Sequence, residues 1–176
     1  MKLLKGEKIR LRAIEPTDVD LILDWENNTD NWEVSGTLAP FSREIISKYV
    51  SNAHLDIYKA GQLRLMIEEL TTGKTVGTID IFDFDPFHQR AGLGILIADK
   101  SDRNNGYSKE TLQLVCEYCF SHLNLQQLYC NILSDNTVSL RLFEKAGFTI
   151  SGTQKRWIKS GSKFKDQHFL QLFNNS

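Results

Sequence analysis

A short polar turn in the middle of the sequence joins an apolar run to an amphipathic helix. Residues 93–98 read Leu-Gly-Ile-Leu-Ile-Ala, which is the length of a buried strand. Residues 109–123 place apolar side chains at helical spacing, and the turn 99–108 between the two contains Gly106. A helix N-terminus after a glycine turn offers unpaired N–H groups and a positive dipole end. We expect this turn to bind the pyrophosphate of a nucleotide-like cofactor; the alternative is a plain structural turn.

Composition limits the classes of protein that the chain can represent. Its 176 residues suit one domain, which we expect to span 1–176, and 41% hydrophobic with 24% charged residues is ordinary for a soluble protein. A net charge of −1 argues against a nucleic-acid-binding domain. No signal peptide or membrane-spanning run is present in the sequence, so we expect a cytoplasmic protein without membrane partners.

Three cysteines could suggest redox or metal chemistry. Cys116 and Cys119 form a C-x-x-C pair, but both fall on the apolar face of the predicted helix, and no second Cys/His pair follows at ligand spacing. We therefore predict that they pack in the core and that the protein binds no metal.

The remaining pattern predicts a mixed α/β (α+β) fold, with about seven strands and about four helices. A loop is expected over 29–40, and the chain contains no internal repeat or linker. Strands are expected at 9–12, 63–70, 76–84, 92–98, 127–133, 148–158 and 164–173, and helices at 15–28, 42–60, 109–123 and 136–147.

A second motif follows the helix and the next strand. Asn136 and Ser139 are followed by Phe143 and by the pair Gly147-Phe148. Together with Arg103-x-x-Gly106-x-Ser108, this segment resembles the GNAT superfamily of acetyl-CoA-dependent N-acetyltransferases. That family has an R/Q-x-x-G-x-G/A turn and an N-x-x-[AS]-x-x-x-[YF]-x-x-x-G-F segment. The chain looks most similar to the bacterial spermidine and ribosomal-protein N-terminal acetyltransferase branches. The resemblance implies a GNAT fold with a mostly antiparallel central sheet.

The same resemblance implies how acetyl-CoA would bind. The strand residues would pair with the pantetheine arm as an added strand does. The turn would hold the pyrophosphate through its N–H groups, with added charge from Arg103. The implied cofactor-binding residues are Ile95, Leu96, Ile97, Arg103, Asn104, Asn105, Gly106, Tyr107, Ser108, Asn136, Ser139, Phe143 and Lys145.

The usual catalytic side chains of the family are missing. Gly92 and Asn131 stand at two positions where a general base is common, and Phe143 replaces the tyrosine that often protonates the thiolate. Water held by polar groups such as Asn131 and Ser139 could carry the proton instead, with positioning supplying most of the catalysis. Alternatively a residue from elsewhere acts, and Asp83, His88 and Tyr129 are candidates. Their simpler interpretations are a turn cap, a surface group and a packed ring.

An acidic loop with one aromatic residue suits a cationic acceptor. Asp30 and Glu33 flank Trp32, so charge pairing and cation–π contact could both bind an amine. We expect an acetyl-CoA-dependent N-acetyltransferase that acts on a polyamine-like small molecule or a protein N-terminal amine, and that forms a homodimer or a larger homo-oligomer. The alternative is a non-catalytic acyl-CoA-binding module of the same fold.

Overall fold

One twisted seven-stranded sheet runs through the molecule. The computed structural model describes residues 3–175, and within them the strand order is β1-β2-β3-β4-β5-β7-β6. Every neighbouring pair is antiparallel except β4 and β5, which are parallel. The expected mostly antiparallel α/β sheet of seven strands is therefore confirmed. The strands are β1 (Ile9–Arg12), β2 (Leu63–Glu69), β3 (Thr75–Asp85), β4 (Arg90–Ile97), β5 (Gln127–Leu133), β6 (Thr149–Ser160) and β7 (Lys163–Phe173).

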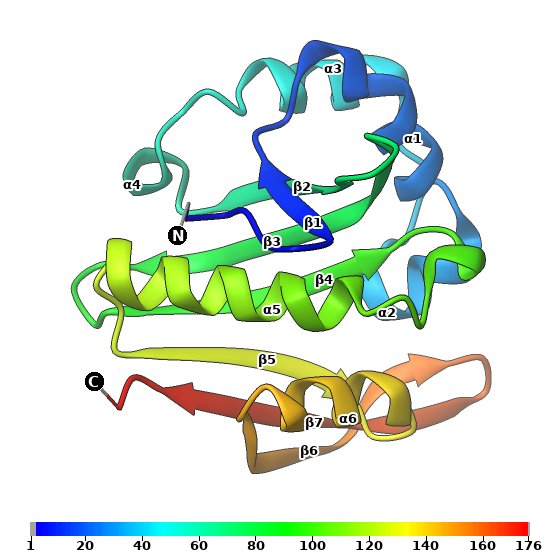
Figure 1. Cartoon of the computed structure of the whole chain (residues 1–176). Coiled ribbons are helices and arrows are strands. Elements are labelled where there is room, and N and C mark those ends of the chain that lie inside the picture. Colours follow the sequence, from blue (N-terminus) through cyan, green and yellow to red (C-terminus); the bar gives the residue numbers. More distant parts are fainter. Residues whose placement is uncertain (1–2, 176) are drawn as a thin grey trace.

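Helices cover both faces of this sheet (Figure 1). α5 and α6 lie on one face, where Leu112 and Phe143 are buried in the larger hydrophobic cluster. α1 and α3 pack over the other face, where Ile22 and Ile46 form a second cluster with Met66 of β2. The helices are α1 (Val19–Glu26), α2 (Trp32–Ser35), α3 (Arg43–Ser51), α4 (Ile57–Ala60), α5 (Tyr107–Glu117) and α6 (Thr137–Lys145).

The prediction of one continuous helix over 42–60 is wrong. It is divided into α3 and α4, because Asn52 ends the first helix and the side chain of Asp56 caps the second. The loop expected over 29–40 contains the short helix α2, which ends at Gly36 in the left-handed conformation. These two differences raise the expected count of about four helices to six among the described residues. The predicted helix 109–123 begins earlier, at Tyr107, and its last turn is a π-helix over Tyr118–His122.

The sheet opens between its two parallel strands. Arg90–Gly92 of β4 pair with Gln127–Tyr129 of β5, and the pairing recorded between the two strands ends there. Beyond that point β4 continues against β3 alone and β5 continues against β7 alone. Figure 1 shows the two strands diverging toward the N-terminal end of α5. The divergence leaves one edge of β4 without a strand partner over residues 93–97.

None of the helices formed by residues 3–175 combines the length and the hydropathy that crossing a lipid bilayer requires.

Candidate active site

The open edge of β4 can pair with an extended ligand. Ile95, Leu96 and Ile97 lie in the part of the strand that has β3 on one side and no strand on the other. Backbone N–H and C=O groups at a free strand edge bind an extended chain as an additional strand would. The structure therefore places the three residues of the predicted pantetheine site where an amide-containing arm fits.

The turn at the end of this groove leaves its amide groups available. Gly106 is the N-cap of α5 with a φ of 85°, and Asn104 also has a positive φ, of 67°. Within residues 3–175, no side chain accepts a hydrogen bond from the N–H groups of residues 106–109. Because a helix of this length keeps its first N–H groups unpaired, the turn is suited to an anion. Its residues fit the diphosphate of coenzyme A.

The N-terminal segment braces this turn. Both carboxylate oxygens of Glu110, in the first turn of α5, accept hydrogen bonds from the backbone N–H groups of Glu7, Lys8 and Ile9 over 2.7–2.9 Å. The ammonium of Lys8 donates to the carbonyl oxygen of Asn105 over 3.0 Å. These contacts fix the start of α5 against β1 and the segment that precedes it.

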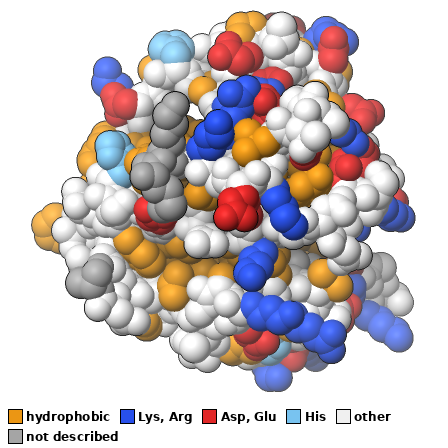
Figure 2. Space-filling model, in the orientation of Figure 1, with side chains coloured by type: hydrophobic (Ala, Val, Ile, Leu, Met, Phe, Trp, Pro, Cys, Tyr) orange, Lys and Arg blue, Asp and Glu red, His pale blue; other side chains and the backbone are white. Residues whose placement is uncertain are grey.

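Basic side chains surround the turn. Figure 2 shows Lys and Arg side chains along the face that runs from the start of α5 to α6 and the β6–β7 hairpin. Arg103, Lys109, Arg141 and Lys145 are exposed, and in the described part of the chain none forms an ion pair with a carboxylate. Their charge is therefore free to attract an anionic ligand such as the phosphates of coenzyme A.

An aromatic ring fills the position where a general base is common in this family. A Cβ atom on Gly92 would lie 2.2 Å from a ring atom of Phe82, whereas one on Gly94 would lie 3.7 Å from the same ring. The ring of Phe82 also packs edge-on against Tyr129, with 5.8 Å between the ring centroids. The ring of Phe82 therefore occupies the space that a side chain at position 92 would need.

A phenol and a carboxylate meet where β4 and β5 separate. The hydroxyl of Tyr129 donates a hydrogen bond to Oδ2 of Asp83 over 2.9 Å. Asp83 has a φ of 48° and lies within the register shift at the end of β3, which turns its carboxylate toward β5. Burial, together with the hydrogen bond and the negative charge of Asp83, raises the pKa of Tyr129 to about 12. The phenol therefore keeps its proton at neutral pH.

The other predicted catalytic residues lie on β5 and α6. Asn131 is exposed on β5, two residues beyond Tyr129, and so lies on the same face of the strand. Ser139 is in the first turn of α6, where its N–H donates to the side chain of Asn136 over 3.2 Å. Asn136 is therefore a helix cap, as its position predicts. Phe143 is buried and packs edge-on against Phe148.

His88 does not join this group. Its N–H donates to Asp85, and its ring packs edge-on against Phe87 in the exposed turn between β3 and β4. Of the three alternative candidates for proton transfer, the structure brings only Asp83 and Tyr129 together.

Lysines lie within ion-pair distance of both acids in the loop predicted to bind the acceptor, and Lys165 is shared with Asp135. Glu33 lies 3.0 Å from the ammonium of Lys165, and Asp30 lies 3.8 Å from that of Lys100. Hydrogen bonds from Ser160 and Lys165 hold the pKa of Glu33 below its usual value. The indole N–H of Trp32 donates to the carbonyl oxygen of Glu26 over 2.9 Å, which ties this loop to the end of α1.

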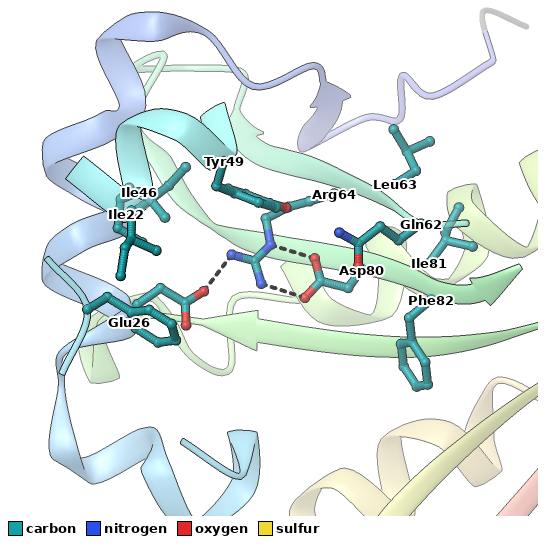
Figure 3. Close-up of a pocket in the computed structure, with 12 residues that line it drawn as sticks. Ile22, Glu26, Ile46, Tyr49, Gln62, Leu63, Arg64, Asp80, Ile81 and Phe82 are labelled. Carbon is teal, nitrogen blue, oxygen red and sulfur yellow. Dashed lines mark hydrogen bonds and ion pairs between the residues drawn. The ribbon is translucent and has the colours of Figure 1, made fainter. Parts of the chain in front are cut away.

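Sequence reasoning missed a cavity of about 310 Å³ beside this loop (Figure 3). It lies between α1, α3, β2 and β3, and its polar residues include Glu26, Arg64 and Asp80. The available signal in the sequence was the placement of Arg64 between two leucines and of Asp80 between two isoleucines. Asp30, Trp32 and Glu33 are not among the residues that line it.

The cysteines pack as predicted. Cys119 and Cys130 are buried in the larger cluster, and burial raises the pKa of Cys116 to about 12. Residues 3–175 contain no group of three or more His, Cys, Asp or Glu side chains that could hold a metal ion.

The fold, the open strand edge and the glycine turn before α5 are those of an acetyltransferase of the GNAT class. The family model for the acetyltransferase (GNAT) domain matches residues 8–149, and the chain belongs to this family. It is an N-acetyltransferase that uses acetyl-CoA as its co-substrate.

Individual relatives agree with this assignment. The chain is 30% identical over 157 residues to the uncharacterized N-acetyltransferase YoaA of Bacillus subtilis, covering 89% of this chain and 88% of that protein. It is 22% identical over 150 residues to the spermidine N(1)-acetyltransferase of Escherichia coli, covering 84% and 76% of the two chains. The structure of spermidine N-acetyltransferase from Vibrio cholerae in complex with CoA and spermine has the same fold. Its TM-score is 0.86 at 18% identity, over 96% of each chain.

Proposed function

We propose that this N-acetyltransferase acetylates a primary amine by direct attack of the amine on the thioester. Both acceptor classes indicated by the sequence, a polyamine-like small molecule and a protein N-terminal amine, present such a group. The observation that carries the proposal is the open edge of β4, which leads from the amides of the Gly106 turn to the pair formed by Tyr129 and Asp83. A ligand held at both ends of this edge has its thioester near a proton donor and a proton acceptor.

Each part of the groove has a separate role in holding acetyl-CoA. The residues of the free edge, Ile95–Ile97, pair with the pantetheine amides, and the residues of the turn, 103–108, bind the diphosphate. Asn136, Ser139, Phe143 and Lys145 border the arm and the nucleotide. When bound, acetyl-CoA supplies an activated carbonyl carbon, and N–H groups of β4 are available to the carbonyl oxygen as it gains charge.

Tyr129 and Asp83 move the proton that the reaction must transfer. Asp83 takes the proton that the attacking amine loses, and Tyr129 gives its phenolic proton to the departing sulfur. The proton on Asp83 then passes to Tyr129 across their 2.9 Å hydrogen bond. One N–C bond forms, one C–S bond breaks, and one proton moves from nitrogen to sulfur. Asn131 and Ser139 hold water or the acceptor beside this path.

Thiol release from acetyl-CoA in the presence of a panel of primary amines tests the proposal. We expect release that depends on an amine, with an acetylated amine identified by mass spectrometry. Binding of acetyl-CoA with no thiol release on any amine would contradict it and would favour the non-catalytic acyl-CoA-binding module.

We also propose that the chain self-associates. Trp157 and Phe164 of the β6–β7 hairpin expose 59% and 50% of their surfaces, and burying such rings favours association. Light scattering after size-exclusion chromatography should give a mass that is a multiple of 20.2 kDa. A mass equal to that of one chain would contradict this proposal.

A further inference from the structure

The ring of Phe82 lies directly on the backbone of β4. Gly92 and Gly94 are two residues apart and therefore share one face of the strand. A Cβ atom on Gly92 would lie 2.2 Å from the ring, and one on Gly94 would lie 3.7 Å from it. Because neither glycine has a side chain, the ring covers the strand at the last residue pair before β4 and β5 separate.

The same ring borders the proton-transfer pair proposed above. It packs edge-on against Tyr129, and the residue that follows it in β3 is Asp83. Phe169 of β7 stacks on the ring of Tyr129 as well, with 5.2 Å between the centroids. The three atoms nearest to a Cβ on Gly92, however, all belong to Phe82. Of the two rings that hold Tyr129, Phe82 is therefore the one that covers Gly92.

Phe82 also lies between the reaction centre and the cavity formed by α1, α3, β2 and β3. Figure 3 shows its ring at one end of the cavity, pointing away from Ile22 and Ile46. The ring lines this cavity of about 310 Å³, and it also contacts Gly92 and Tyr129. A group that extends from the reaction centre toward the cavity therefore meets the ring first.

The position of the ring bears on the acyl group of the thioester. A pantetheine arm paired with the free edge of β4 over 93–97 cannot continue within the sheet, because Gly92 and Tyr129 pair there. The thioester must therefore turn out of the sheet on the face that carries the phenol of Tyr129. The acyl carbons beyond the carbonyl then lie over Gly92, beside the ring of Phe82.

Resting on the acetyltransferase function proposed above, we propose that Phe82 limits the length of the acyl group that the enzyme transfers. An acetyl group fits beside the ring, whereas further methylene groups overlap it. The bonds that form and break are the same for every acyl chain, so its length changes only the fit. Without the ring, a longer chain reaches the apolar walls of the cavity, which include Leu63 and Ile81.

Thiol release from acetyl-CoA, propionyl-CoA and butyryl-CoA, with a panel of primary amines that includes spermidine, tests this inference. An extra methylene group in a closed apolar site costs about tenfold or more in kcat/KM, so we expect butyryl-CoA to be used at least about tenfold less well than acetyl-CoA. Equal use of the two donors would overturn the inference and leave the proposed function intact. Release from none of the three donors with any amine, by a protein that binds acetyl-CoA, would overturn both.

Two variants test whether the ring sets the limit. Phe82→Ala should bring the kcat/KM values of acetyl-CoA and butyryl-CoA to within about threefold of each other. Phe82→Leu keeps an apolar side chain at this half-buried position and should give an intermediate ratio. It also provides the answer if Phe82→Ala does not fold.

Phe169→Ala is the matched control, because it removes the second half-buried ring that packs on Tyr129. It should slow transfer from both donors alike and leave their kcat/KM ratio at the wild-type value. A ratio that stays unchanged in the Phe82 variants, or that changes equally in Phe169→Ala, would overturn the inference.

Discussion

The hydroxyl of Tyr129 donates a hydrogen bond to Asp83 across the point where the two parallel strands separate, over 2.9 Å. This contact supplies the polar pair that the family's usual positions lack, since Gly92, Asn131 and Phe143 carry no acid or base. In the mechanism that we propose, a carboxylate at the irregular end of β3 and a phenol on β5 take the place of those side chains. The pair can both accept and donate a proton without another side chain.

Removing either member of this pair should slow the reaction without weakening the binding of acetyl-CoA. We expect Asp83→Asn and Tyr129→Phe each to lower kcat by about 10²-fold, the range typical of a lost general acid or base. Calorimetry should give the wild-type Kd for acetyl-CoA. Tyr118→Phe is the matched control, because Tyr118 stacks on His122 away from the opening. A kcat within threefold of wild type for both variants would contradict the proposed proton path.

The raised pKa of Tyr129 makes a separate prediction about pH. A pKa of about 12 means that the phenol is protonated below that pH and loses its proton as the pH rises through it. The rate should therefore not fall between pH 7 and pH 10 through loss of this donor. In Asp83→Asn, burial remains but the negative charge is lost, so the pKa of Tyr129 should move down toward its usual value of about 10. Ultraviolet titration, with Tyr129→Phe as the reference, measures both values.

The contact between Phe82 and Gly92 predicts how a side chain introduced at position 92 would affect stability. Gly92→Ala should destabilise the protein by about 1–3 kcal/mol, because the new Cβ overlaps the ring of Phe82. In the Phe82→Ala background, the same change should cost much less. Urea denaturation of the four proteins gives the coupling energy, and equal costs in the two backgrounds would show that the ring is not the obstacle.

The buried carboxylate of Asp18 predicts how the stability of the fold depends on pH. Burial opposes ionisation of Asp18, but hydrogen bonds from Arg12 and from the N–H of Glu15 bring its pKa below the usual value. Its stabilising effect is therefore present above about pH 4 and is lost as the pH falls through the lowered pKa. Asp18→Asn should cost about 3 kcal/mol at pH 7 and much less near pH 2. Denaturant melts at the two pH values test this, and an equal cost at both would contradict it.

Sequence periodicity predicted most of the sheet because its strands alternate or are uniformly apolar. The helix break at 52–56 was not predicted, since apolar spacing continues through it and only the caps at Asn52 and Asp56 interrupt it. The glycine turn before α5 follows from a local motif and could be anticipated, whereas its binding of the cofactor stays a prediction. The pairing of Arg64 with Asp80 could not, because it depends on the register between β2 and β3. For the same reason, the lysine partners of Asp30 and Glu33, which lie far along the chain, were missed.

The conformation of the turn before α5 should control cofactor affinity. Gly106 adopts a φ of 85°, and a Cβ atom there would also lie 3.1 Å from the ammonium of Lys8. A left-handed alanine costs about 1–2 kcal/mol, so Gly106→Ala should shift the turn away from this conformation. The shift should weaken acetyl-CoA binding about tenfold. Gly161→Ala, at an exposed hairpin with a φ of 59°, carries the same backbone cost away from the groove and should leave Kd unchanged. Equal Kd values for both variants and the wild type would contradict the assigned role of the turn.

A crystal structure of the chain with coenzyme A tests the central claim most directly. The account predicts that the pantetheine amides pair with the backbone of residues 93–97 and that the diphosphate receives hydrogen bonds from the amides of residues 104–108. Coenzyme A bound elsewhere, with the edge of β4 and the Gly106 turn free of contacts to it, would contradict the account.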